Sequence, residues 1–328
     1  VLSCVLESSQ TPLRRKTCVS PSSGKALVGS VRVFVLRKGM PESLPLAAYR
    51  IPQHWLALFK ILTINFLAGG QMNNHHFKGN RVTTALLLAA GSGNRLQPLT
   101  DSIPKCLIEI NGRPILERLI DNLCDNGFKR LVIVVGYMHH CIRRFVNEYA
   151  GDLTIEFITN PLYQTTNNIY SLWLARNKIQ ELFLLVESDL VFESSQLEGL
   201  LYPNKIAISR MQPWMNGTTI TIDSLNRVQA FGMGGNGYTE ITRYKTVNIY
   251  SLSDSTWRKV VERLELHISS GKVNEYYEVV FKTMIADGSL SMNGVFFDPE
   301  CWYEIDTPVD LANAERILEE TDTYPEAF

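Results

Sequence analysis

The chain of 328 residues lacks most features that mark secreted, zinc-binding or membrane-spanning proteins. Its six cysteines include no CxxC pair and no His/Cys cluster at zinc-ligand spacing, which indicates a reducing compartment, so we expect a cytoplasmic protein. The densest apolar stretch before residue 80, residues 54–70, is interrupted by Lys60 and is shorter than the roughly 20 residues that a spanning helix needs. We therefore expect no firm membrane association, and we also expect no nucleic acid partner.

Charge divides the chain into two unequal parts. Hydrophobic residues make up 45% of the sequence, enough to bury a full core in one large domain or two small ones. Residues 1–71 carry nine Lys/Arg against two Asp/Glu, and the remainder carries 23 against 31. We expect residues 1–81 to be a basic leader and residues 82–328 to form the folded domain. The leader is either a targeting or membrane-surface segment, or a disordered over-extension of the reading frame. In the second case the natural protein starts at Met72, and we adopt this interpretation.

Strand and helix patterns alternate from about residue 82. This alternation predicts an α/β fold in three layers, with a doubly wound and mostly parallel sheet, followed after residue 205 by a strand-rich part. Ligands of such domains bind beyond the carboxyl ends of the strands. The expected strands are 84–89, 131–135, 153–158 and 182–186, and the expected helices are 115–126, 140–149, 169–178, 257–269, 276–286 and 308–320.

A glycine-rich turn follows the first expected strand, in the segment LLLAAGSGNRLQPLTDSIPKCL at residues 86–107. Gly91 and Gly93 leave room for a phosphate against bare backbone N–H groups, and Arg95 and Lys105 bring positive charge to the same mouth. The turn has neither the third glycine of GxGxxG nor the GK[ST] ending of a P-loop. Although isolated basic residues are usually surface charges, this placement predicts a nucleoside triphosphate site.

The sequence LAAGSGNRL, with PKCL ten residues after the arginine, resembles the signature of nucleotidyltransferases that join a nucleoside triphosphate to a phosphorylated small molecule. The resemblance covers about residues 84–318 and implies a Rossmann-like nucleotidyltransferase core. It further implies that Arg95 binds the outgoing pyrophosphate and that Lys105 screens the repulsion between acceptor and α-phosphate. The residues expected to bind the nucleotide are Leu88, Ala89, Ala90, Gly91, Ser92 and Gly93.

Two acidic residues are candidates for a magnesium site. Asp189 ends an expected strand, and Asp306 lies in the turn YEIDTP. Mg²⁺ prefers one or two carboxylates together with phosphate oxygens and water. The family resemblance implies that Asp189 and Asp306 hold Mg²⁺. Other interpretations stay open: Asp189 could serve a turn, Asp306 could cap the last helix, and Glu187 and Asp310 are nearby substitutes.

Residues 160–172, NPLYQTTNNIYSL, resemble a segment of the bacterial CTP:phosphocholine cytidylyltransferases and of related phosphonate cytidylyltransferases. By this resemblance Asn168 contacts the nucleotide or the substrate, or else it caps the helix that follows. Lys245 is expected to approach the acceptor phosphate.

Aromatic residues suggest the acceptor. Three of them, with one acid, stand where the phosphocholine enzymes place theirs, and aromatic faces with a carboxylate suit an ammonium head group through cation–π attraction and charge pairing. Taken singly, each aromatic residue is better explained by core packing, and it is the three matching positions together with one acid that favour a cationic head group. The residues expected to line the head-group pocket are Trp214, Tyr276, Glu278 and Tyr303.

Together these features predict a Mg²⁺-dependent cytidylyltransferase. It would join CMP from CTP to phosphocholine, phosphoethanolamine or 2-aminoethylphosphonate and release pyrophosphate. The alternative enzyme is a sugar-1-phosphate nucleotidyltransferase that uses UTP, GTP or dTTP. A catalytically silent nucleotide-binding regulator is the alternative of another class, and the joint presence of Arg95, Lys105, Asp189 and Asp306 argues against it.

Overall fold

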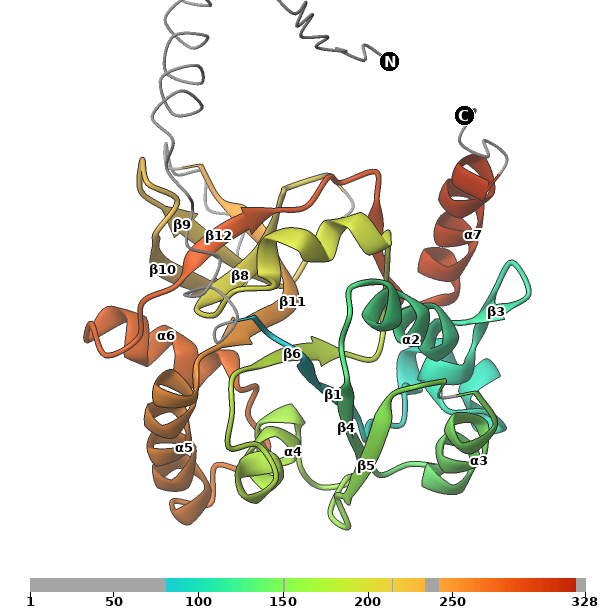
Figure 1. The fold of residues 1–328 in the computed structure, drawn as a ribbon, viewed down its shortest axis with the longest axis horizontal. Coiled ribbons are helices and arrows are strands. Elements are labelled where there is room, and N and C mark those ends of the chain that lie inside the picture. The colour runs from blue at the N-terminus through green and yellow to red at the C-terminus, as the bar shows by residue number, and fades with distance from the viewer. Residues whose placement is uncertain (1–80, 150, 214, 234–241, 323–328) are drawn as a thin grey trace, which may run out of the picture. The chain divides into compact units, whose positions relative to one another are not determined.

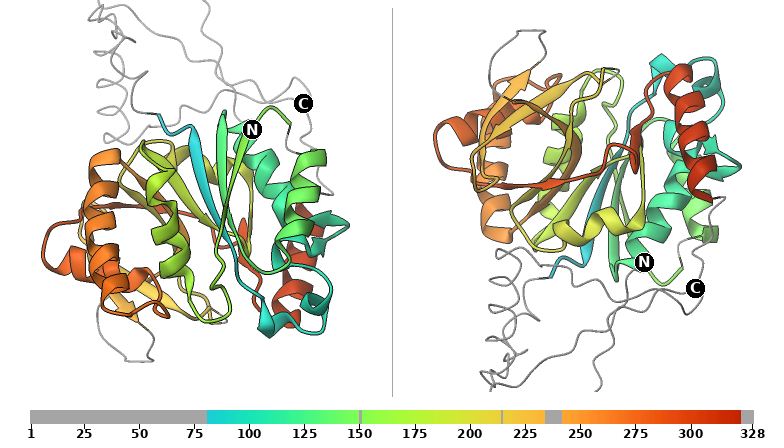
Figure 2. Two further views of the ribbon diagram at one scale, coloured as in Figure 1. Left: turned by 90° about the horizontal axis from the view of Figure 1, so that it is seen from below. Right: turned by 90° about the horizontal axis from the view of Figure 1, so that it is seen from above.

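The computed structural model describes residues 81–149, 151–213, 215–233 and 242–322, with side chains described as far as residue 318. The expected leader, residues 1–81, lies outside this part of the chain except for its last residue. The described residues form a mixed sheet with helices on both faces (Figures 1 and 2). In this part of the chain, no helix combines the length and the apolar character that crossing a bilayer requires.

The central strands of the sheet are parallel, and on one side antiparallel pairs follow, except that the outer strand β12 pairs parallel with β8. Along the sheet the order is β10-β9-β11-β6-β1-β4-β5, with β8 paired to β11 and β12 paired to β8. Strands β6, β1, β4 and β5 run parallel, whereas β11 runs antiparallel to β6. The bounds are β1 Thr84–Ala89, β4 Arg130–Val135, β5 Thr154–Thr159, β6 Phe183–Glu187, β8 Lys205–Arg210, β9 Thr218–Ile222, β10 Val228–Met233, β11 Tyr244–Leu252 and β12 Asn293–Phe296.

Helices cover both faces of this sheet. Helices α2 and α3 lie on one face, and α4, α5 and α6 lie on the other (Figure 2). Two small antiparallel pairs, β2–β3 and β7–β13, complete the domain. The bounds are α2 Ile115–Asp125, α3 His139–Tyr149, α4 Asn168–Leu174, α5 Asp254–Ser269, α6 Glu278–Ala286, α7 Pro308–Asp322, β2 Glu109–Ile110, β3 Arg113–Pro114, β7 Leu190–Phe192 and β13 Trp302–Glu304.

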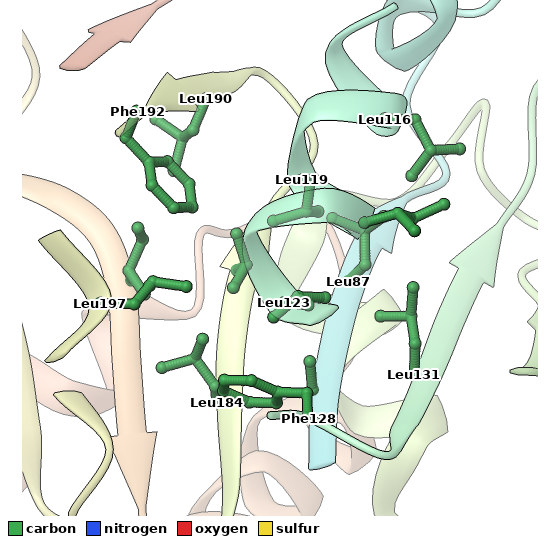
Figure 3. Close-up of a cluster of buried hydrophobic side chains, with 14 of the residues drawn as sticks. Leu87, Leu116, Leu119, Leu123, Phe128, Leu131, Leu184, Leu190, Phe192 and Leu197 are labelled. Carbon is green, nitrogen blue, oxygen red and sulfur yellow. The ribbon is translucent and has the colours of Figure 1, made fainter. Parts of the chain in front are cut away.

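Strand β1 explains why the sheet has a hydrophobic core on each of its two faces. Its side chains are all buried, and because successive residues of a strand point to opposite faces, Leu87 packs with α2 while Leu86 and Leu88 pack toward α4. Figure 3 shows Leu87 among the leucines of α2, with Phe128 below them. Burying each such leucine contributes about 1.5–3 kcal/mol. A strand apolar on both faces is therefore fixed at the centre of the sheet, and its carboxyl end is fixed with it.

The α/β prediction is confirmed, with small changes at the element ends. Helix α2 closes as expected at Gly127, whose φ of +73° suits a glycine and whose N–H donates to the Cys124 carbonyl. The expected helix 169–178 is shorter, because α4 ends at Leu174 and a 3₁₀ turn follows at Ala175–Asn177. Helix α6 begins at Glu278, two residues later than expected.

Candidate active site

A cleft of about 290 Å³ opens at the carboxyl ends of β1 and β6. This is where a doubly wound sheet is expected to bind ligands, because the connections from neighbouring strands diverge there. The lining is contributed by the glycine turn, the β5–α4 connection, the end of β6, the start of α6 and the turn before α7. The lining residues are Leu88, Ala90, Gly91, Gly93, Asn94, Arg95, Lys105, Asn160, Tyr163, Thr166, Asn167, Asn168, Ser171, Glu187, Ser188, Asp189, Tyr276 and Asp306.

The two glycines of the turn have different roles. Gly93 adopts φ +67°, and a Cβ there would lie 3.2 Å from the Lys105 Cβ and 3.0 Å from the Thr100 Cγ2. The Thr100 hydroxyl also donates to the Gly93 carbonyl at 3.0 Å, which holds the turn in place. At Gly91, by contrast, a Cβ would meet nothing within 4 Å. Gly93 is needed for the turn itself, whereas the space beside Gly91 is open at the cleft.

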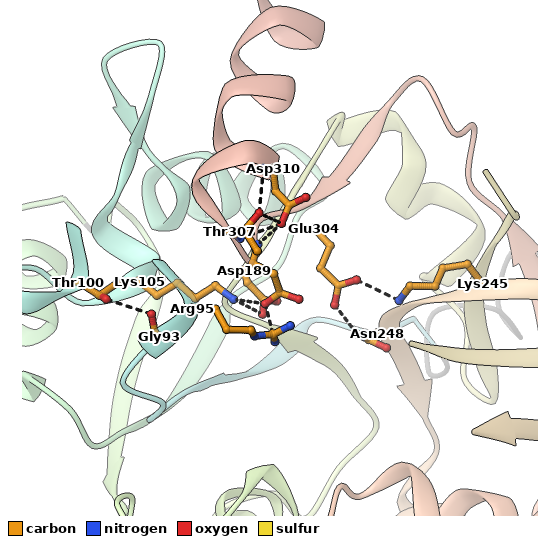
Figure 4. Close-up of polar contacts among 11 residues, drawn as sticks. Gly93, Arg95, Thr100, Lys105, Asp189, Lys245, Asn248, Glu304, Thr307 and Asp310 are labelled. Atoms are coloured by element: carbon orange, nitrogen blue, oxygen red, sulfur yellow. Dashed lines mark hydrogen bonds and ion pairs between the residues drawn. The ribbon is translucent and has the colours of Figure 1, made fainter. Parts of the chain in front are cut away.

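Lys105 joins the two acidic residues that the sequence singled out. Its ammonium donates to Asp189 Oδ2 and to Asp306 Oδ1, each at 2.8 Å (Figure 4). The Arg95 guanidinium also pairs with Asp306 Oδ1 at 2.8 Å, although its side chain is 66% exposed. Burial by itself would lower the pKa of Lys105, but the two carboxylates outweigh it and the pKa is raised. The lysine therefore stays charged, and all four predicted charges lie within one constellation.

The two acidic residues are positioned by the pairing of β7 with β13. Asp189 immediately precedes β7. Asp306 comes shortly after the end of β13, with Ile305 between the strand and Asp306. The Ile305 N–H donates to the Asp189 carbonyl at 2.8 Å, so the two backbones are joined at the site. Residues that are 117 positions apart in sequence are thus held side by side by backbone hydrogen bonds.

The interpretation of Asp306 as a helix cap is wrong. Asp310 Oδ2 accepts hydrogen bonds from the backbone N–H groups of Thr307, at 2.7 Å, and Asp306, at 3.2 Å. The Thr307 hydroxyl in turn accepts from the Asp310 N–H at 3.3 Å, which is the reciprocal pattern of a capping box. Because Thr307 and Asp310 serve the start of α7, the Asp306 carboxylate faces the cleft, and Asp310 does not replace it there.

The donor set at these two carboxylates fits a divalent cation. Asp189 Oδ1 is buried and has no hydrogen-bond partner among the described residues, and Asp189 Oδ2 and Asp306 Oδ1 already converge on one positive group. Carboxylate oxygens are the ligands that Mg²⁺ prefers, with phosphate oxygens and water completing the octahedron. In the described part of the chain, no cluster of three or more His, Cys, Asp or Glu side chains forms a metal site. A metal here would rest on two carboxylates.

Asn168 connects the cleft to α6. Its amide group donates to Glu187 Oε1 at 3.0 Å, and its Oδ1 accepts the Tyr277 backbone N–H at 3.0 Å. The expectation that Asn168 itself caps α4 is wrong, because the cap is Asn167, whose side chain accepts the Asn168 N–H. Asn168 lines the cleft while it fixes Glu187 and the first turn of α6.

A second charged group lies beyond Asp189. The Lys245 ammonium pairs with Glu304 Oε2 at 3.0 Å and donates to the Thr246 carbonyl at 2.8 Å, with a side chain only 3% exposed. Asn248 donates to Glu304 Oε1 at 3.2 Å and adopts φ +59° where the β11–β8 pairing shifts register. Figure 4 shows Glu304 between Asp189 and Lys245. Glu304 and Asn248 were not singled out from the sequence. What identifies them is their contact with each other and with Lys245, which only the fold brings about.

The predicted head-group residues are only partly brought together. Tyr276 lines the cleft and is 52% exposed, and Glu278 begins α6 with its side chain buried. Tyr303 does not reach the cleft, because it packs in a separate core beneath α7 and its hydroxyl accepts from the Asn313 amide. Alternation along β13 turns the neighbouring Glu304 toward the site instead. Trp214 lies outside the described residues.

Three buried carboxyl groups of the site share a raised pKa. For Glu187, Glu278 and Glu304 burial is the largest cause, and neighbouring carboxylates add to it. The Lys245 ammonium opposes the rise at Glu278 and Glu304. This end of the site therefore holds more acid than its single lysine balances.

Comparisons with known proteins agree with this geometry. Residues 85–202 match the family model described as the MobA-like NTP transferase domain. The CMP-5'-(3-aminopropyl)phosphonate synthase of Streptomyces rubellomurinus is 30% identical over 249 residues, which cover 70% of this chain and 38% of that protein. The 2-aminoethylphosphonate cytidylyltransferase of Lancefieldella rimae is 26% identical, covering 70% of this chain and 91% of that protein.

A solved structure shows the same fold. The CTP:phosphocholine cytidylyltransferase of Streptococcus pneumoniae superposes with a TM-score of 0.63 at 24% identity, covering 73% of this chain and 99% of that one. The chain spans well under half the length of the Streptomyces relative.

Proposed function

We propose that the chain, whose residues 85–202 match the MobA-like NTP transferase domain, is a Mg²⁺-dependent cytidylyltransferase. It transfers CMP from CTP to a small phosphorylated amino-alcohol or aminophosphonate and releases pyrophosphate. The names of two relatives, an aminopropylphosphonate CMP synthase and an aminoethylphosphonate cytidylyltransferase, support the choice of base and acceptor. The observation that carries the proposal is Lys105, held at 2.8 Å from both Asp189 and Asp306 at the mouth of the glycine turn.

In the proposed reaction an acceptor oxygen attacks the α-phosphorus of CTP and pyrophosphate leaves. The backbone at Gly91 accommodates the phosphates, since nothing occupies the space where a side chain would stand. Lys105 screens the repulsion between the acceptor and the α-phosphate and stabilises the charge that develops there. Arg95, which is exposed and pairs with Asp306 through its guanidinium, binds the departing pyrophosphate in this scheme.

Asp189 and Asp306 would hold Mg²⁺, which neutralises phosphate charge when bound. The buried, unpartnered Oδ1 of Asp189 supports this assignment. The acceptor already carries an ionised oxygen, so no group of the protein has to remove a proton from it.

Measuring pyrophosphate release tests the proposal. The protein is incubated with Mg²⁺ and CTP plus phosphocholine, phosphoethanolamine or 2-aminoethylphosphonate, and in parallel with UTP or dTTP plus hexose 1-phosphates. Turnover with CTP and an amino acceptor is the expected result. Turnover only with the sugar phosphates would assign the chain to sugar-1-phosphate nucleotidyl transfer, and nucleotide binding without pyrophosphate release from any acceptor would make it a silent nucleotide-binding protein.

A further inference from the structure

The connection between β4 and α3 lies against the glycine turn. Tyr137, in the middle of this three-residue connection, contacts the turn at two places. Its backbone N–H donates to the Ala90 carbonyl at 3.0 Å, and its hydroxyl donates to the Thr100 carbonyl at 2.8 Å. One tyrosine is therefore bonded to both ends of the segment 91–99, which carries both glycines of the turn and Arg95.

The backbone around Tyr137 is closely confined. A Cβ on Gly136 would lie 2.7 Å from the Ala90 carbonyl oxygen and 2.7 Å from the Tyr163 Cβ, so the connection is packed between the glycine turn and the β5–α4 connection. The rings of Tyr137 and Tyr163 also contact each other, at 6.2 Å between centroids. Met138 adopts φ +43°, a conformation that a non-glycine residue keeps only where surrounding contacts enforce it. Tyr137 is thus a fixed point to which the turn is attached.

The segment held in this way has few other anchors. Of residues 91–100, Leu96 and Thr100 are buried and the others are at least partly exposed. Its two helical turns are short 3₁₀ turns, whose hydrogen bonds have poorer geometry than those of an α-helix. The Thr100 hydroxyl donates to the Gly93 carbonyl at 3.0 Å (Figure 4). A restraint on Thr100 is therefore passed directly to the left-handed turn at Gly93.

We propose, resting on the function proposed above, that Tyr137 is a positioning residue that holds the glycine turn in the conformation that binds the triphosphate of CTP. Tyr137 is not one of the residues that line the cleft, so it acts through the turn. Without its hydroxyl the turn of the free protein also populates other conformations, and the apparent dissociation constant rises by the inverse of the fraction that can bind. The net strength of one hydrogen bond limits this rise to about 2- to 12-fold.

Two tyrosine variants separate this role from a loss of stability. Tyr137→Phe removes the hydroxyl alone. Tyr149→Phe is the matched control, because Tyr149 is also half-buried, ends α3, and donates its hydroxyl to Asp121 Oδ1 at 2.9 Å away from the cleft. Both variants lose one tyrosine hydrogen bond and should unfold at slightly lower temperature. We expect Tyr137→Phe alone to bind the nucleotide more weakly.

Calorimetric titration in Mg²⁺ measures the dissociation constants of CTP and of CMP, which lacks the β- and γ-phosphates. In Tyr137→Phe the constant for CTP should rise by about 2- to 12-fold and that for CMP by less than about 2-fold, while Tyr149→Phe keeps the wild-type constants. In pyrophosphate release, KM for CTP should rise by the same factor. The kcat and the KM for the acceptor should stay within about 2-fold, because bound CTP itself orders the turn.

A second variant tests the path through Thr100. Thr100→Val removes the hydroxyl that donates to Gly93 and keeps the shape of the side chain, so it should also weaken CTP binding. Because both hydrogen bonds hold the same turn, the double variant should raise the dissociation constant by less than the product of the two single effects. Effects that multiply overturn the path through Thr100.

The remaining outcomes distinguish this proposal from the proposed function. A Tyr137→Phe protein that binds CTP as the wild type does, or that weakens CTP and CMP equally, overturns the positioning role and leaves the proposed function intact. A wild-type protein that binds neither CTP nor another nucleoside triphosphate overturns both.

Discussion

Replacing Glu278 with glutamine should make the protein clearly more stable at pH 8 and only slightly more stable at pH 5. Burial raises the pKa of the Glu278 carboxyl from 4.5 to about 7, against the opposing effects of its own backbone N–H and of Lys245. The folded protein therefore prefers the neutral acid, which an amide imitates in shape and charge. The side chain lies at the first position of α6, where it is packed rather than solvated.

The size of this stability difference follows from the protonation equilibria of Glu278 in the folded and in the unfolded chain. Below pH 4.5 the carboxyl is neutral in both the folded and the unfolded chain, so its stabilising contribution is complete. Between pH 4.5 and 7 only the unfolded chain ionises, and stability is lost as the pH rises through the folded-state pKa. The total loss is about 3 kcal/mol, since each pKa unit corresponds to about 1.4 kcal/mol. In a domain of this size that equals a melting-temperature difference of about 6–12 °C.

Urea unfolding of the wild-type protein, Glu278→Gln and the exposed control Glu262→Gln at pH 5, 6, 7 and 8 measures this difference. The free energy of unfolding of Glu278→Gln should exceed that of the wild type increasingly from pH 5 to pH 8, while the control follows the wild type. A Glu278→Gln protein that is no more stable at pH 8, or whose advantage is the same at every pH, would refute the reasoning. The predicted gain would mean that the buried Glu278 carboxyl lowers the stability of the folded protein at neutral and alkaline pH.

Four further variants test the site and its support. Lys105→Ala and Asp189→Asn should each lower the rate of pyrophosphate release by at least about 100-fold with an unchanged circular dichroism spectrum, and near-full activity would remove that residue from the scheme. Gly136→Ala, just after β4, should lower the free energy of unfolding by about 1–3 kcal/mol in thermal melts, because the added Cβ would lie 2.7 Å from the Ala90 carbonyl oxygen. An unaltered melting temperature would show that the backbone at Ala90, where the glycine turn begins, can move away from it. Asn167→Ala should lose about 1 kcal/mol in urea unfolding by removing the cap of α4, whereas no loss would mean that the cap contributes nothing.

The part of the site that could be predicted from sequence is the part fixed by local rules. Gly93 is required by a left-handed turn, and Asp189 follows closely on a strand that is apolar from Phe183 to Val186, so both are recognisable in a short stretch of sequence. The carboxyl ends of parallel strands meet at one edge of the sheet, so Asp189 is expected near the glycine turn. This expectation needs no prediction of a longer-range contact.

The rest of the site depends on strand register and on contacts between residues far apart in the chain, which cannot be predicted from the sequence. The choice between Tyr303 and Glu304 is a matter of which face of β13 meets β7, and a shift of one residue exchanges them. Glu304 acquires its role from Lys245, 59 positions earlier in the sequence, and Asn248 from an irregularity in β11. Asn167 and Asn168 are chemically identical neighbours, so only the backbone at the start of α4 decides which of them caps the helix.

The pairing of β13 with β7 also sets the order in which the protein can become active. During synthesis the glycine turn, Lys105 and Asp189 emerge early, and the strands that carry them can pair before residue 302 exists. Glu304 and Asp306 arrive more than a hundred residues later, and until they dock, Lys105 has one carboxylate partner and Lys245 has no acidic partner from β13. A nascent chain can therefore contain a folded nucleotide cleft and still lack Asp306, one of the four charges of the site. If the proposed function holds, activity begins only after the segment at residues 302–306 has left the ribosome.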